Sequence, residues 1–139
     1  MTGNCLCGAV SVTIQERPDF IHDCNCSMCR KSGGAWGYFS PATVTVTGDT
    51  ISYLRNDKDN AAAEVHTCRT CGTTTHWALS DAFRAQNESA DIMGVNMKIF
   101  DPHALAGVEV RFPDGKAWAG SGPFEYRRDA MTISAALPW

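Results

Sequence analysis

Apolar and polar residues alternate over short stretches of this chain, and the alternation predicts β-strands. Val10, Val12 and Ile14 are separated by a serine and a threonine, which is the two-residue period of a strand with one buried face. Other short runs rich in β-branched, aromatic or aliphatic residues predict further strands at 35–39, 44–46, 50–54, 64–67, 73–79, 92–97 and 108–112. Pro18 interrupts the pattern before segment 20–23, and Gly48-Asp49 is a turn signal.

Helical periodicity is scarce. We expect a turn or two of helix at 27–32, and another at 102–106, where Asp101 can act as N-cap and Pro102 can occupy the first helical position. The chain shows no composition break, linker or repeat. We therefore predict one domain over residues 1–139, with a mainly β fold and very little helix.

Composition and charge narrow the class of protein. Hydrophobic residues make up 44% of the 139 residues and charged residues 19%, a balance typical of a globular chain with a modest core rather than a disordered one. The net charge of −3 offers no broad attraction for phosphate backbones. Nucleic acid is therefore not expected as a partner.

The chain also lacks the signals of membrane insertion and export. No apolar run approaches the roughly 20 residues that span a bilayer. The first residues have neither the charged nor the apolar region of a signal peptide, so we expect a cytoplasmic protein with no membrane partner. In a reducing compartment, seven closely spaced cysteines are more typical of metal ligands than of disulfides, which also favour an even count.

Two cysteine pairs predict one closed metal site. Cys5 and Cys7 are two residues apart and can face one side of an extended segment, while Cys68 and Cys71 form a Cys-x-x-Cys turn followed by Gly72. Gly72 can take the positive φ that such turns often require. Four thiolates match a tetrahedral structural zinc site; the alternatives are an unmetallated Cys-x-x-Cys or a redox pair.

Cys24, Cys26 and Cys29 form the third cluster, which predicts a different kind of site. Three protein ligands leave one coordination position of a zinc ion open, and open positions are where catalytic zinc works. A thiol in that position would lose its proton, and an aldehyde oxygen or a water could equally be polarised there. The alternative is a structural site closed by an acidic residue or by a histidine, namely His22, His66 or His76.

Basic residues follow this cluster directly. Arg30 and Lys31 would offset the negative charge of a three-thiolate zinc centre, or attract an anionic substrate. No residue stands out as a general base, and His22 and His76 are only weak candidates.

The motifs Cys-x-Cys-Gly-Ala-Val at 5–10, Cys-x-Cys-Ser-x-Cys-Arg-Lys-x-x-Gly at 24–34 and Cys-x-x-Cys-Gly at 68–72 resemble the glutathione-dependent formaldehyde-activating enzyme family. Segment 94–102 is similar to that family's last strand and Asp-Pro turn, so the resemblance covers nearly the whole chain.

The resemblance implies a mainly antiparallel, zinc-stabilised β-tent fold with two zinc ions per chain. Its structural zinc ligands match Cys5, Cys7, Cys68 and Cys71, and its catalytic zinc ligands match Cys24, Cys26 and Cys29. The activity implied is that of a carbon–sulfur lyase that joins formaldehyde to the thiol of glutathione, giving S-hydroxymethylglutathione. Glutathione or a related small thiol and an aldehyde are then the expected partners.

Two positions depart from the family pattern. Asn25 stands where many members carry histidine, and Met28 stands where the family often has a polar residue. Neither change removes a ligand, but both alter the pocket and hence the substrate. Other readings are a non-catalytic zinc-stabilised binding module for protein or chromatin, and a thiol redox or zinc-storage protein. The sequence leaves the oligomeric state open.

Overall fold

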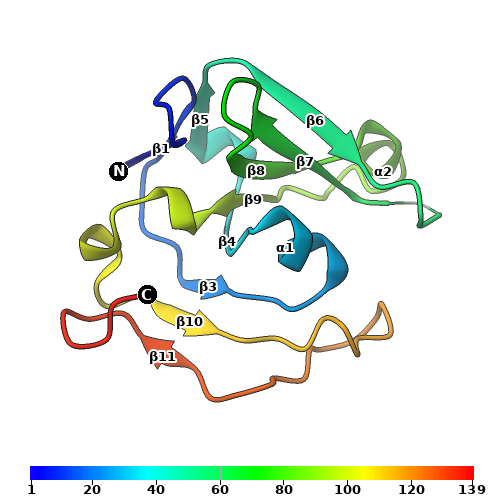
Figure 1. Ribbon diagram of the computed structural model, residues 1–139. Coiled ribbons are helices and arrows are strands. Elements are labelled where there is room, and N and C mark those ends of the chain that lie inside the picture. Colours follow the sequence, from blue (N-terminus) through cyan, green and yellow to red (C-terminus); the bar gives the residue numbers. More distant parts are fainter. Residues whose placement is uncertain (60) are drawn as a thin grey trace.

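The computed structural model describes residues 1–59 and 61–139 and shows two β-sheets with little helix (Figure 1). A three-stranded sheet has the order β1 (Thr2–Asn4), β2 (Ser11–Ile14), β5 (Val44–Thr47). The larger sheet has eight strands, in the order β11 (Met131–Thr132), β10 (Glu109–Arg111), β3 (Phe20–His22), β4 (Trp36–Phe39), β9 (Met93–Asn96), β8 (Thr74–Leu79), β7 (Ala63–Cys68), β6 (Thr50–Leu54). The prediction of a mainly β fold is confirmed.

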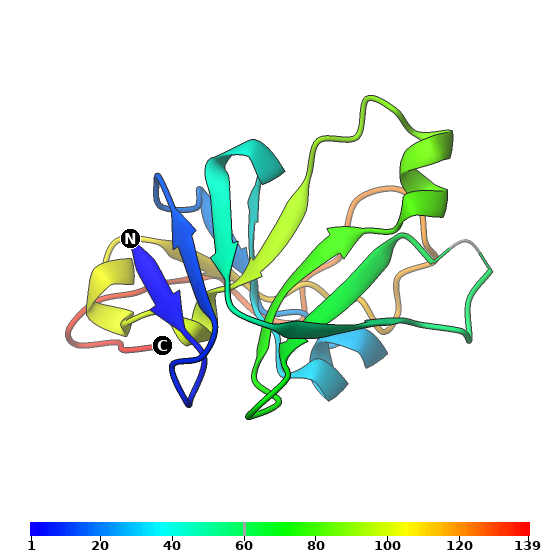
Figure 2. The ribbon, with the colours of Figure 1, turned by 90° about the horizontal axis from the view of Figure 1, so that it is seen from above.

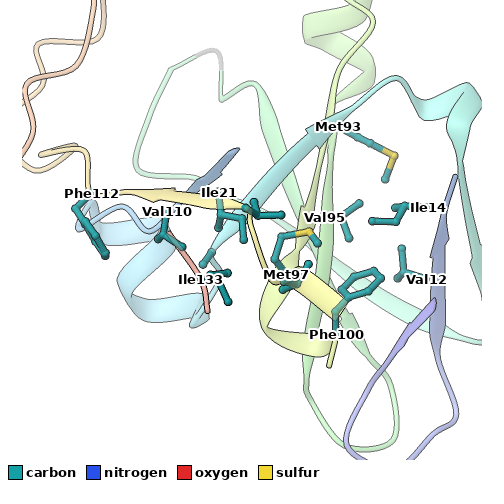
Figure 3. Packing of buried hydrophobic residues seen from close by; sticks show 13 residues of the cluster. Val12, Ile14, Ile21, Met93, Val95, Met97, Phe100, Val110, Phe112 and Ile133 are labelled. Atoms are coloured by element: carbon teal, nitrogen blue, oxygen red, sulfur yellow. The ribbon is translucent and has the colours of Figure 1, made fainter. Parts of the chain in front are cut away.

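The strand pattern of the sequence agrees with the burial of the side chains. Val10, Val12 and Ile14 have no exposed surface, whereas Thr13 between them is exposed. Figure 3 shows Val12 and Ile14 facing Val95 of β9, so the small sheet closes one side of the core. The view from above in Figure 2 places β1, β2 and β5 beside the strands of the larger sheet.

The strand pairing is mainly antiparallel, as expected, with one exception. β10 pairs with β3 in parallel, with Glu109 opposite Phe20 and Arg111 opposite His22, while the other pairs of described strands are antiparallel. A parallel pair needs a long connection, and here most of the chain lies between the two strands. The segments that leave β3 and β10 therefore run in the same direction, side by side.

The helical elements were predicted in part. Helix α1 spans Ser27–Ser32, and a 3-10 helix spans Pro102–Leu105 with Asp101 as N-cap, both as expected. Helix α2 (Asp81–Gln86) was missed, although Ser80 accepts a hydrogen bond from the Phe83 amide as a regular N-cap. The 3-10 helices at Pro41–Thr43 and Met97–Ile99 and the short strands β1 and β11 were missed as well. None of the described helices is long and apolar enough to cross a membrane.

Candidate metal centres

Four cysteines from two distant turns meet at one end of the molecule. Cys5 and Cys7 follow β1, Cys68 ends β7, and Cys71 lies in the turn before β8. The sulfur of Cys7 lies 3.6 Å from that of Cys5 and 3.7 Å from that of Cys68, and all four Sγ atoms lie within 4.8 Å of one another. This group could hold one metal ion.

The two turns are built alike, which explains why the four sulfurs converge. The amide of Gly8 donates to the carbonyl of Cys5 at 3.0 Å, and the amide of Gly72 donates to that of Cys68 at 2.9 Å. Both glycines have positive φ, 77° and 72°, as expected for Gly72. Thr73 links the turns, because its hydroxyl accepts from the Leu6 amide at 3.2 Å and lies 3.2 Å from the sulfur of Cys71.

The remaining three cysteines converge at the start of α1. Cys26 is the N-cap, and its sulfur accepts a hydrogen bond from the Cys29 amide at 3.5 Å. The Cys26 amide in turn donates to the sulfur of Cys24 at 3.4 Å, and the sulfurs of Cys26 and Cys29 are 3.3 Å apart. Cys29 is buried, and the other two are partly exposed. This three-cysteine centre could also hold a metal ion.

The thiols of this centre cannot all ionise side by side without a cation. Contact with the thiols of Cys24 and Cys29 lowers the pKa of Cys26 to about 2, whereas contact with Cys24 and Cys26, together with burial, raises the pKa of Cys29. One thiolate is thus stabilised at the expense of its neighbours. A soft divalent cation removes this conflict because it favours all three thiolates, so the donor set fits zinc.

No histidine or acidic residue among residues 1–59 and 61–139 joins the three sulfurs in a metal-binding group. His22 is buried, and its Nδ1 lies 3.0 Å from the Tyr38 hydroxyl, while Nε2 has no hydrogen-bond partner. Burial, followed by the charge of Arg111, lowers the pKa of His22 to about 4, so the ring is neutral. His66 and His76 stack on each other at 4.3 Å, on β7 and β8.

Two aromatic residues of β4 line the three-cysteine centre. The indole Nε1 of Trp36 donates to the sulfur of Cys29 at 3.2 Å. Burial, then the negative charges of Cys29 and Cys24, raises the pKa of Tyr38, so its phenol stays protonated within electrostatic reach of the sulfurs. Neither residue was among the site residues predicted from the sequence. Their spacing of two in a strand, which places them on one face, was the available signal.

A cavity of about 660 Å³ lies between α1 and the strands β6 and β7. Ser27 and Met28, which adjoin Cys26 and Cys29 in the chain, line it together with Lys31 and Arg55. Arg55 donates to Ser27 Oγ at 3.2 Å and pairs with Asp57 at 2.6 Å. The volume lies within the range of small-molecule sites.

Comparison with solved structures finds similarity to a crystal structure of a protein from Rhodobacter sphaeroides. The TM-score is 0.56, the sequence identity is 26%, and the match covers 78% of this chain and 97% of the other. A comparison with curated proteins found no match.

The family comparison agrees with the cysteine motifs. The family model described as glutathione-dependent formaldehyde-activating enzyme matches residues 1–112, a range that contains all seven cysteines. The match ends at residue 112 of the 139, so segment 113–139 lies outside it. The chain belongs to the glutathione-dependent formaldehyde-activating enzyme family.

Proposed function

We propose that this protein is a zinc-dependent carbon–sulfur lyase that reversibly joins formaldehyde to the thiol of glutathione, or performs a closely related reaction. The observation that carries the proposal is the three-cysteine centre, which gathers three sulfurs and no fourth protein ligand from the described residues. Three ligands are the number found in catalytic zinc sites, whereas four are found in structural ones. Family membership favours glutathione and formaldehyde as the reactants.

In this proposal each cysteine cluster holds one zinc ion. Cys5, Cys7, Cys68 and Cys71 form the closed structural site, and Cys24, Cys26 and Cys29 hold the second ion with a position left for substrate. Zinc bound in this way acts as a Lewis acid that lowers the pKa of an incoming thiol and polarises an oxygen nearby.

The chain's own residues position the reactants. The cavity beside α1 has room for the body of a small thiol, and Lys31 offers a cation for a carboxylate of glutathione. Tyr38, protonated and with its hydroxyl 3.0 Å from His22 Nδ1, offers a hydroxyl within electrostatic reach of the sulfurs that can hydrogen-bond the oxygen of the aldehyde.

The reaction is a simple addition. A carbon–sulfur bond forms, the π bond of the aldehyde breaks, and the proton lost from the thiol is matched by one gained on oxygen. Neither oxidant nor reductant is required, so holding the two reactants together supplies much of the catalysis.

The test is to mix protein, glutathione and formaldehyde and to measure the exchange rate between free glutathione and its hydroxymethyl adduct by NMR. Wild-type protein should accelerate the exchange, and Cys26→Ser should not. Equal rates with and without protein would reject the lyase proposal and favour a non-catalytic zinc-stabilised binding module. Metal analysis should find two zinc ions in wild type and one in Cys26→Ser.

A further inference from the structure

The segment that follows β10 lies against the three-cysteine centre. Because β10 and β3 are parallel, the chain beyond Arg111 continues beside the chain beyond His22, which carries Cys24 and Cys26. The amide of Asp23 donates to the carbonyl of Arg111 at 2.9 Å, so the pairing extends past the strands. Residues 113–117, here called the strap, are thereby brought alongside Cys24 and Cys26; Figure 1 shows this part of the chain next to the loop before α1.

The side chain of Asn25 holds the strap at two points. Its Nδ2 donates to Asp114 Oδ1 at 2.7 Å, and its Oδ1 accepts from the backbone amide of Lys116 at 2.9 Å. An amide is suited to this task because it carries a donor and an acceptor side by side. Asn25 thus uses both ends of its side chain on the strap, from a position between two cysteines.

Gly115 lies between these two anchoring points and makes a very close approach to the cysteines. A Cβ placed on Gly115 would lie 2.4 Å from Cys24 Sγ and 3.0 Å from Cys26 Cβ. A side chain at this position would therefore collide with the sulfur unless the strap moved away. The backbone of the strap covers Cys24 so closely that only glycine fits.

Further contacts hold the strap from its outer side. The amide of Asp114 donates to the carbonyl of Glu125 at 2.7 Å, and Pro113 pairs with Tyr126. Arg127 then reaches back to Asp23, with its Nη2 2.7 Å from the carbonyl and 3.1 Å from the carboxylate. Both residues that flank Cys24 in the chain, Asp23 and Asn25, are consequently bonded to residues outside the 1–112 range of the family match.

We propose that Asn25 clamps the strap over Cys24 and that the strap closes this side of the three-cysteine centre, so that a thiol must approach from the side of Ser27 and Met28. Cys29 is itself buried and is covered by the buried ring of Trp36. The cavity lined by Ser27 and Met28 remains as the approach. Asn25, Asp114 and Gly115 are then positioning residues that determine which thiols fit.

The direction from which a thiol approaches rests on the proposed function, whereas the clamp made by Asn25 does not. The clamp is therefore tested first. Reduced protein with its metal content unchanged is treated with iodoacetamide, and the alkylation rates of Cys24 and Cys7 are followed by mass spectrometry. Asn25→Ala should raise the rate at Cys24 by about tenfold, the loss expected from two hydrogen bonds, and leave Cys7 unchanged. Gly115→Ala should act in the same direction, because the added methyl group displaces the strap.

Two matched variants complete the experiment. Asp114→Asn keeps an acceptor for Asn25 and should remain close to wild type. Asn87→Ala removes a side-chain amide that donates to the Phe83 carbonyl in α2, far from the strap in sequence, and should not change either rate. An unchanged rate at Cys24 in both Asn25→Ala and Gly115→Ala would overturn the proposal. Parallel increases at Cys24 and Cys7 would overturn it too, because they would show a general loss of stability.

If the clamp is confirmed, glutathione should be compared with a smaller thiol in the exchange assay. The ratio of the KM for glutathione to the KM for the smaller thiol should be closer to one in Asn25→Ala than in wild type, by at least about threefold. Absence of catalysis in wild type would reject the lyase proposal and leave the alkylation result standing.

Discussion

The indole nitrogen of Trp36 donates a hydrogen bond to the sulfur of Cys29 at 3.2 Å, and both residues are buried. A hydrogen bond to a thiolate favours its charged form, and a buried one is little weakened by water. The position of Trp36 depends on Gly34, since a Cβ there would lie 2.0 Å from the indole ring. Gly34, two residues after the end of α1, thus allows an aromatic donor to reach the buried sulfur of Cys29.

Trp36→Phe tests this contact. Phenylalanine retains much of the buried ring but has no N–H to donate, so the second zinc ion should bind about tenfold more weakly, as is typical when a partner of a metal ligand is removed. Competition with a chelator of known affinity measures the change. Trp118→Phe, at an indole that bonds to the Gly122 carbonyl, is the matched control. Equal zinc affinities in wild type and Trp36→Phe would assign the indole a packing role only.

The two cysteine clusters should differ in their contribution to stability. The four-cysteine site joins distant turns, with the sulfurs of Cys7 and Cys68 in contact although the residues are 61 apart in the chain. The three-cysteine centre links residues within a single short loop and helix. Cross-linking distant segments removes more conformational freedom from the unfolded chain, and structural zinc contributes about 10–16 kcal/mol in small domains.

Cys68→Ser should therefore unfold the protein or lower its Tm by more than about 15 °C, whereas Cys26→Ser should lower Tm by less than about 5 °C. Thermal unfolding followed by circular dichroism, with zinc counted in both variants, checks this order. Similar losses of Tm in the two variants would mean that both ions stabilise the fold to the same extent.

The sequence was sufficient for those features that depend on local patterns. Alternating residues such as Val10, Val12 and Ile14 located the strands, and the cysteine spacings predicted the two groups of sulfurs. Both signals are local because side-chain direction repeats every two residues in a strand, and because two ligands in one turn must be closely spaced.

The parallel pairing of β3 with β10 could not be predicted in the same way. It joins Phe20 to Glu109, and the choice between parallel and antiparallel neighbours depends on the path of the whole chain between them. The position of the strap depends on that pairing, so the contact of Gly115 with Cys24 could not be predicted from the sequence either. Asn25 was recognised as a departure from the family, but its partner Asp114 is 89 residues away.

Lys31 should contribute to substrate binding more than to chemistry. It lines the cavity beside α1 and takes part in none of the ion pairs found in residues 1–59 and 61–139, whereas the charge of Arg55 is paired with Asp57. Lys31→Met should raise KM for glutathione by about 3- to 10-fold at constant kcat, because an exposed charge attracts the anion equally in the ground and transition states.

Kinetics at two salt concentrations provide the check. The advantage of wild type over Lys31→Met should shrink as ionic strength rises, because salt screens exposed charges. Lys98→Met removes an exposed lysine from the turn after β9 and should leave KM unchanged. A fall in kcat at constant KM would place Lys31 in the reaction step instead.

His76 should make the protein less stable in mild acid. The ring is 7% exposed, lies opposite His66 on β7 and Val95 on β9, and has its Nδ1 3.0 Å from the Thr75 hydroxyl. Burial, followed by the charge of His66, lowers its pKa from 6.5 to about 4. Between pH 6.5 and 4, His76 is therefore protonated in the unfolded chain but remains neutral in the folded chain. Stability is full above pH 6.5 and falls by up to about 3 kcal/mol as the pH drops towards 4.

Unfolding by urea at pH 7, 6 and 5 measures this loss. Protonation of the cysteine ligands also weakens the fold in acid, so the informative quantity is the difference between wild type and His76→Gln, which retains the cysteines. The variant should lose less stability than wild type between pH 7 and 5, whereas His103→Gln, at an exposed ring, should follow wild type. Parallel pH profiles for wild type and His76→Gln would show that His76 does not contribute to the acid sensitivity.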